Sequence, residues 1–131
     1  MKSKYIDANI FIQAIVRNEN DCIKVLEKII RKEFIGVTSV LSWDEVTFIV
    51  QKFLGKDIAK IEGNQFLKFP NLVFIETKKD IMIKAQKLFE EYNLKPRDAI
   101  HAATALYMNI NEIISEDKDF DKIKELKRIS P

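Results

Sequence analysis

The stretch that decides the fold runs from Lys95 to Asp121 and reads KPRDAIHAATALYMNINEIISEDKDFD. Its first half is expected to be a helix from Pro96 to Met108, because proline is favoured in the first turn of a helix. A short apolar strand from Glu112 to Ser115 follows and runs into an acidic segment. A helix followed by a short buried strand is the building unit of an α/β protein.

The same alternation continues through the rest of the chain. Short apolar runs bounded by charged or turn-forming residues are typical of strands, and longer segments with apolar residues at helical spacing are typical of helices. We expect further strands over Lys4–Asp7, Phe34–Val37, Leu72–Glu76 and Arg128–Ser130, and helices over Asn9–Val16, Asp21–Arg31, Thr38–Leu54, Asp57–Phe69 and Lys79–Tyr92. Thr38 is expected to cap the third of these helices and Gly55 to end it. The predicted fold is α/β, a three-layer α/β/α sandwich with a central, mainly parallel sheet of four to five strands.

Size and composition fit one globular domain over residues 1–131. Hydrophobic residues make up 47% of the chain and charged residues 32%, and the net charge is only +2, so charge alone does not indicate a nucleic-acid binder. The lone Cys22 cannot form an internal disulfide, and we expect a buried, inert thiol in a reducing cytoplasm. No apolar run is long enough to span a membrane, so a soluble cytoplasmic protein is expected.

Two acidic residues follow predicted strands. Asp7 closes the first strand, and Asp117 follows the strand Glu112–Ser115. Groups at the carboxyl ends of parallel strands face the ligand crevice of an α/β sheet. Each has an alternative: Asp7 or Asn9 could cap the next helix, and the acidic run after the strand could be a solvated loop. Within that run Asp117 is the favoured inward acid, with Asp119 second.

Two more acidic residues lie on predicted helices. Glu45 emerges between apolar neighbours, unlike the adjacent Asp44, and therefore needs a partner, either in a polar site or in a salt bridge to a Lys or Arg. Asp98 lies in the first turn of its helix, where the helix dipole favours an anion. Ala102 and Ala105 share its face, and these small side chains leave room for a ligand beside the carboxylate.

A cluster of carboxylates is stable only with bound cations or retained protons, because two carboxylates about 4 Å apart repel by roughly 4 kcal/mol at an effective dielectric near 20. Oxygen ligands select hard ions, so Mg²⁺ or Mn²⁺ is expected and Zn²⁺ is not. Such a site can deprotonate water and hydrolyse a phosphodiester. The phosphate-binding glycine loop and the GxSxG serine motif are absent. His101, the only histidine, lies near the face of Asp98 and is either a satisfied helical histidine or a group that contacts the substrate or the acid.

Four segments carry a resemblance to a known family: YIDANIFI (5–12), SWDEV (42–46), KPRDAIHAATAL (95–106) and IISEDKDFD (113–121). In order and spacing they resemble the four motifs of PIN-domain ribonucleases, particularly the small VapC-like toxins. The resemblance covers nearly the whole chain, and its third and fourth segments are the most specific. It implies Mg²⁺- or Mn²⁺-dependent cleavage of RNA with one or two ions, frequent homodimers, and an antitoxin chain that blocks the site.

Carried over by position, Asp7, Glu45 and Asp98 look like the three main acids and Asp117 like the fourth. The resemblance also places two polar residues near the site, Asn9 and Ser115. The basic residues nearest to the acids in the sequence are candidates for binding substrate phosphates; they are Lys95, Arg97, Lys118 and Lys122. Three alternatives remain open: an RNA-processing enzyme, a DNA-directed nuclease, and a non-catalytic nucleic-acid-binding scaffold.

Overall fold

The computed structural model describes residues 1–131, which form five strands, six α-helices and one 3₁₀ helix. The strands are β1 (Ser3–Ile6), β2 (Ile35–Ser39), β3 (Leu72–Ile75), β4 (Glu112–Ile114) and β5 (Lys127–Ile129). The helices are α1 (Ala8–Arg17), α2 (Asn20–Ile30), α3 (Ser42–Leu54), α4 (Lys56–Leu67), α5 (Lys79–Glu91), α6 (Pro96–Tyr107) and the 3₁₀ helix η1 (Lys118–Lys122). Every predicted strand and helix is present, and apart from the start of α3 the ends differ by at most two residues.

All five strands are parallel and lie in the order β3-β2-β1-β4-β5. The first strand is central, and its Tyr5 lies opposite Val37 of β2 and Ile113 of β4. The carboxyl ends of β1, β2 and β4 therefore meet at one edge of the sheet. Residues that are about 30 and 110 positions apart in the chain are neighbours there.

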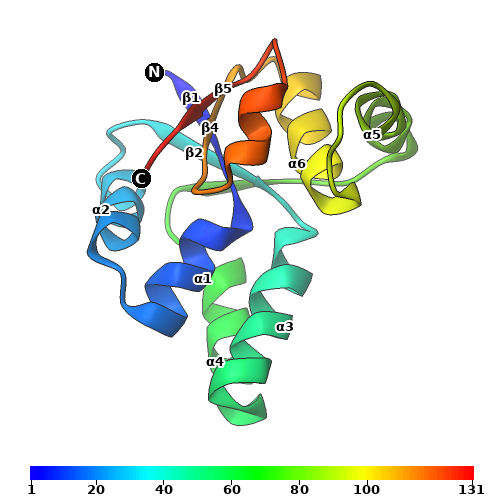
Figure 1. Cartoon of the computed structure of the whole chain (residues 1–131). Helices are drawn as coiled ribbons and strands as arrows, with labels where there is room; N and C mark the ends of the chain where they lie inside the picture. Colours follow the sequence, from blue (N-terminus) through cyan, green and yellow to red (C-terminus); the bar gives the residue numbers. More distant parts are fainter.

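Helices cover both faces of the sheet, because successive side chains of a strand point to opposite faces. Tyr5 and Ile113 belong to the hydrophobic cluster formed with α5 and α6, whereas Ile6 and Ile114 belong to the cluster formed with α1, α2, α3 and α4. Figure 1 shows α5 and α6 together on one side of the strands. The predicted three-layer α/β/α sandwich is confirmed.

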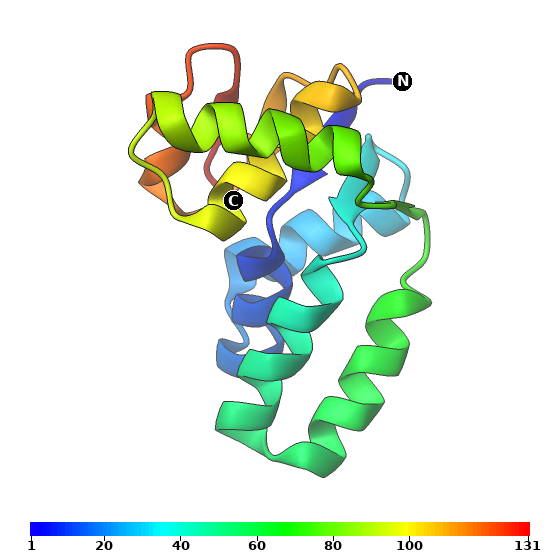
Figure 2. The same cartoon turned by 90° about the vertical axis from the view of Figure 1, so that its right-hand side faces the viewer.

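The helices α3 and α4 form an antiparallel hairpin that extends away from the sheet (Figure 2). Gly55 ends α3 as predicted, and its φ of 89° is one that side-chain-bearing residues rarely adopt. Gly63 allows close packing, because a Cβ at this position would lie 2.6 Å from the Thr47 methyl group. Several large apolar side chains of the hairpin stay exposed, among them Phe48, Phe53, Ile58 and Ile61.

The predicted start of α3 is wrong. Thr38 does not cap this helix; it lies inside β2, opposite Phe74 of β3, and α3 begins at Ser42. The Thr38 hydroxyl donates to the Ile6 carbonyl at 2.9 Å and lies 2.8 Å from the Ser42 hydroxyl. Strand pairing on both sides of β2 outweighs the local preference of threonine for a helix start.

Two further expectations concern single features. No helix has the length and hydropathy needed to cross a membrane. Cys22 is buried, and burial followed by the charge of Glu116 raises the pKa of its thiol to about 12. The thiol is therefore protonated at neutral pH, which agrees with the inert cysteine that the sequence predicts.

Candidate metal centre

Asp7 is anchored at the carboxyl edge of the sheet by Ser115. The two residues follow the neighbouring strands β1 and β4, and the buried Ser115 hydroxyl donates to Asp7 Oδ2 at 2.6 Å. The same hydroxyl accepts the backbone N–H of Asp117 at 2.9 Å. Asp7 precedes α1, but its side chain makes no capping hydrogen bond, so capping does not account for this carboxylate.

The environment of Asp7 disfavours its charged form. Burial raises the pKa of Asp7, and the neighbouring Glu45 raises it further, while His101 and the Ser115 hydroxyl lower it. The net shift is upward. A buried carboxylate with this balance gains stability from a bound cation.

Glu45 projects from the first turn of α3 toward Asp7. Its side chain is 19% exposed, and its Oε1 atom lies 2.6 Å from His101 Nε2. The partner that the sequence demands for Glu45 is therefore a histidine and not a Lys or Arg. The adjacent Asp44 stays exposed and pairs with Arg97 at 3.6 Å.

His101 lies beneath the acids and is fully buried on α6. Its Nε2 atom is 3.8 Å from Asp7 Oδ1, and its Nδ1 atom lies 2.6 Å from the Tyr5 hydroxyl. Burial lowers the pKa of His101, but Tyr5, Glu45 and Asp7 raise it well above its ordinary value. Both ring nitrogens of His101 therefore have hydrogen-bond partners, and one of the partners is an acid of the site.

Sequence reasoning missed Tyr5, although a signal for it exists. Tyr5 and Asp7 are two positions apart around a strand end, so their side chains point to the same face. A tyrosine on the buried face beside an acid needs a polar partner for its hydroxyl. That partner, His101, is 96 positions away in the chain and becomes visible only in the fold.

Asp98 and Asp117 face each other across the edge of the sheet. Asp98 is in the first turn of α6, yet Lys95 occupies the N-cap position and no side chain caps this helix. Burial, followed by the charge of Asp117, raises the pKa of Asp98 to about 7. Asp98 is only 9% exposed, and its buried Oδ2 atom has no hydrogen-bond partner.

Two further predicted residues, Asp119 and Asn9, lie beside these four acids. Asp119 offers an oxygen within 4.8 Å of those of Asp98 and Asp117, and it also pairs with Lys122 at 3.1 Å. Asp117 in turn accepts the backbone N–H of Asp119 at 2.9 Å and caps η1. Asn9 lies inside α1, with its amide 3.4 Å from the Ser115 hydroxyl. These neighbours favour Asp117 over Asp119 as the fourth acid.

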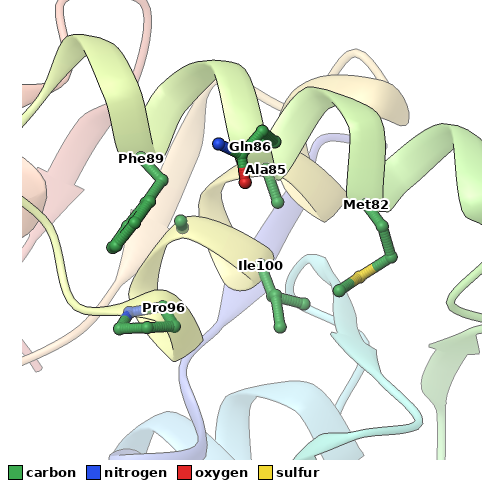
Figure 3. A pocket seen from close by; sticks show the side chains of 7 residues that line it. Met82, Ala85, Gln86, Phe89, Pro96 and Ile100 are labelled. Atoms are coloured by element: carbon green, nitrogen blue, oxygen red, sulfur yellow. The ribbon is translucent and has the colours of Figure 1, made fainter.

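A polar hollow of about 570 Å³ opens onto the acids. None of the residues that line it is hydrophobic: they are Glu45, Lys95, Pro96, Arg97, Asp98 and Asp117. A separate hollow of about 280 Å³ between α5 and α6 is mainly apolar. Figure 3 shows Met82 and Phe89 of α5 and Pro96 and Ile100 of α6 around it. Of these two hollows, only the polar one is lined by charged groups that can bind a cation or act on a substrate.

The acids fit a divalent cation. Potential ligand atoms gather in two groups, each within 4.8 Å: Asp7, Glu45 and His101 in one, and Asp98, Asp117 and Asp119 in the other. The buried oxygen of Asp98 without a partner, and the raised pKa of both Asp7 and Asp98, are the signs of carboxylates that lack a counter-charge. Carboxylate oxygens in this number suit Mg²⁺ or Mn²⁺.

Five parallel strands between two helical layers, with four acids at the carboxyl edge of the sheet, define an α/β/α protein with a candidate cation centre. The family model of the PIN domain matches residues 4–126, so the chain belongs to the PIN-domain family. This match confirms the resemblance found in the four sequence motifs.

Similar proteins agree with this assignment. Over 60 residues the chain is 32% identical to Ribonuclease VapC6 of Methanocaldococcus jannaschii, a match that spans 46% of this chain and 39% of the relative. Among solved structures, a toxin-antitoxin complex from Klebsiella pneumoniae is 24% identical, with 94% of each chain covered and a TM-score of 0.71. VapBC2 from Rickettsia felis bound to a promoter DNA fragment is 18% identical, with 98% of each chain covered and a TM-score of 0.79. At these identities the structures establish the shared fold.

Proposed function

We propose that the protein is a Mg²⁺- or Mn²⁺-dependent endoribonuclease and the toxin of a toxin-antitoxin pair. The observation that carries the proposal is the buried, unpartnered Asp98 oxygen beside a polar hollow that Glu45, Asp98 and Asp117 line. Membership of the PIN-domain family and the similarity to a protein named as a ribonuclease support the choice of reaction and substrate.

In this proposal Asp7, Asp98 and Asp117 hold the ion or ions, and Glu45 is a ligand or the hydrogen-bond acceptor for the attacking water. The ion, when bound, supplies Lewis acidity that lowers the pKa of water and neutralises charge on the phosphate. The chain itself holds the acids in place. Ser115 orients Asp7 through its 2.6 Å hydrogen bond, and its contact with the backbone of Asp117 ties the first acid to the fourth.

The proposal predicts which nucleic acid is cut. With Mn²⁺, single-stranded RNA is expected to be cleaved internally, whereas single-stranded DNA and flapped duplexes of the same sequence stay intact. Gel analysis of the three end-labelled substrates in parallel is the measurement. Cleavage of DNA alone would replace the proposal with a DNA-directed nuclease, and cleavage of none would favour a binding scaffold.

We propose that Arg97 and Lys118 bind substrate phosphates beside the acids. Arg97 lines the hollow and forms an exposed ion pair with Asp44 at 3.6 Å. Because an exposed ion pair contributes little free energy, Arg97 can leave Asp44 and bind a phosphate. Replacing either residue with Ala is expected to raise KM with little change in kcat. The slope of log(kcat/KM) against log salt concentration should become shallower by about 0.7 for each lost contact with single-stranded RNA. Lys28→Ala, an exposed change in the last turn of α2, is the matched control and should leave the slope unchanged.

We further propose that the protein acts with protein partners, an antitoxin chain and a second copy of itself. Exposed apolar side chains on α3, α4 and α5 support this, because a surface of this kind marks protein interaction sites. They include Phe48, Phe53, Ile61, Met82 and Phe89. Analytical ultracentrifugation of the chain alone, and with the product of a small open reading frame adjacent to its gene, tests both partners. A monomer under all conditions would argue against them.

A further inference from the structure

Tyr5 and His101 form a buried chain of hydrogen bonds that ends on the acids. Both side chains are fully buried, and neither lines the polar hollow. The Tyr5 hydroxyl lies 2.6 Å from His101 Nδ1, and His101 Nε2 lies 2.6 Å from Glu45 Oε1. The chain therefore reaches Glu45 from the interior of the protein and not from the polar hollow.

The position of the protons follows from the partners of the Tyr5 hydroxyl. Its oxygen already accepts the backbone N–H of Ser39 at 3.1 Å, so its single hydrogen is available for His101 Nδ1. When Nδ1 accepts, the neutral ring carries its proton on Nε2. A charged ring also has a proton on Nε2. In both forms Nε2 donates to Glu45.

A proton on Nε2 means that His101 is not itself a metal ligand. Although its ring lies within 4.8 Å of the oxygens of Asp7 and Glu45, a nitrogen that carries a proton cannot bind a cation. Without a nitrogen ligand, the site consists of oxygens alone and suits hard ions.

We propose that Tyr5 and His101 are positioning residues that fix one carboxylate oxygen of Glu45 and leave the other for the ion or the attacking water. Tyr5 sets the tautomer of the imidazole, and the imidazole sets the orientation of Glu45. Partners that orient ligands in this way typically change activity or metal affinity by about 10- to 100-fold when they are removed. The catalytic part of this inference rests on the proposed ribonuclease function.

Two substitutions at one position separate positioning from packing. The amide nitrogen of Gln reaches about as far as His Nε2, whereas that of Asn reaches only about as far as Nδ1. His101→Gln is therefore expected to retain most of the kcat for RNA cleavage. His101→Asn is expected to lower kcat by about 10- to 100-fold with little change in KM. Equal losses in the two variants, at equal melting temperatures, would overturn the proposal.

A second measurement needs neither variants nor nuclease activity. His101 is the only histidine, so the imidazole nitrogen signals of ¹⁵N-labelled protein are unambiguous. Nε2 is expected to carry a proton in the metal-free protein and to keep it in saturating Mg²⁺. Tyr5→Phe is expected to move part of the proton to Nδ1. An unprotonated Nε2, or one that loses its proton when Mg²⁺ is added, would make His101 a ligand and overturn the proposal even if the ribonuclease assignment holds.

Discussion

Asp98→Asn is expected to lower the kcat for RNA cleavage by roughly 10³-fold while the protein stays folded. The size follows from the several kcal/mol of charge stabilisation that a bound ion supplies, at 1.36 kcal/mol for each factor of ten. The amide keeps the shape of the side chain but loses the charge that holds the cation. Cleavage rates of the purified variant, measured with saturating Mn²⁺, give the result.

We expect Asp98→Asn to be at least as stable as the wild type in the absence of metal. Burial and Asp117 raise the pKa of Asp98 to about 7, so the carboxylate is unfavourable in the metal-free protein, and the neutral amide removes a repulsion. The melting temperature in EDTA should equal or exceed that of the wild type. Asp57→Asn is the matched control, because Asp57 lies in the first turn of α4 and is exposed. Undiminished cleavage by Asp98→Asn would refute the site assignment.

Removal of the cation is expected to abolish cleavage and to lower stability. EDTA should stop the reaction, and Mg²⁺ or Mn²⁺ should restore it. An ion at 100 times its Kd stabilises the folded state by about 2.7 kcal/mol. For a domain of this size that corresponds to a rise in melting temperature of roughly 10 °C. Thermal melts with EDTA and with each ion measure this shift.

The stabilisation of the folded protein by the bound ion should be larger at high pH. The pKa of Asp98 is raised to about 7 in the folded state, so between about pH 4 and about pH 7 native Asp98 keeps a proton that the unfolded chain has released. The raised pKa of Asp7 acts in the same direction above its ordinary value. The raised pKa of His101 acts in the same direction above its ordinary value of 6.5. Metal-free stability therefore falls as the pH rises from 5 to 8.

Two controls accompany the melts. The melting temperature of Asp98→Asn should depend less on pH and should rise less with Mn²⁺, because one of the carboxyl groups with a raised pKa is gone. If neither EDTA nor Mn²⁺ changes the melting temperature or any nuclease activity, the acids are structural and the protein is a binding module.

Local patterns were sufficient for the elements but not for every boundary. Pro96 marks the start of α6 and Gly55 the end of α3, because the backbone preferences of these residues act within one turn. Thr38 shows the limit of this reasoning. Its preference for a helix start is weaker than the hydrogen bonds of a strand with neighbours on both sides, and those neighbours are remote in sequence.

In the candidate site, too, local patterns predicted the positions of the acids but not their partners. Asp7 and Asp117 follow strands, and Asp98 opens a helix, so their places could be predicted from position alone. Glu45 was recognised as an acid that needs a partner, yet the identity of the partner could not be predicted. It is His101, which is 56 positions away on a helix of the opposite layer.

The sequence by itself determined the order of strands and helices, the three-layer class and the four acids at the ends of elements, because periodicity, proline and glycine act locally. The tertiary structure alone decided the strand order β3-β2-β1-β4-β5, which places Asp7 beside Ser115, and the chain from Tyr5 through His101 to Glu45. The physical reason is that hydrogen bonds between residues about 50 to 110 positions apart depend on how the whole chain packs. The local preferences of single residues contain no information about that packing.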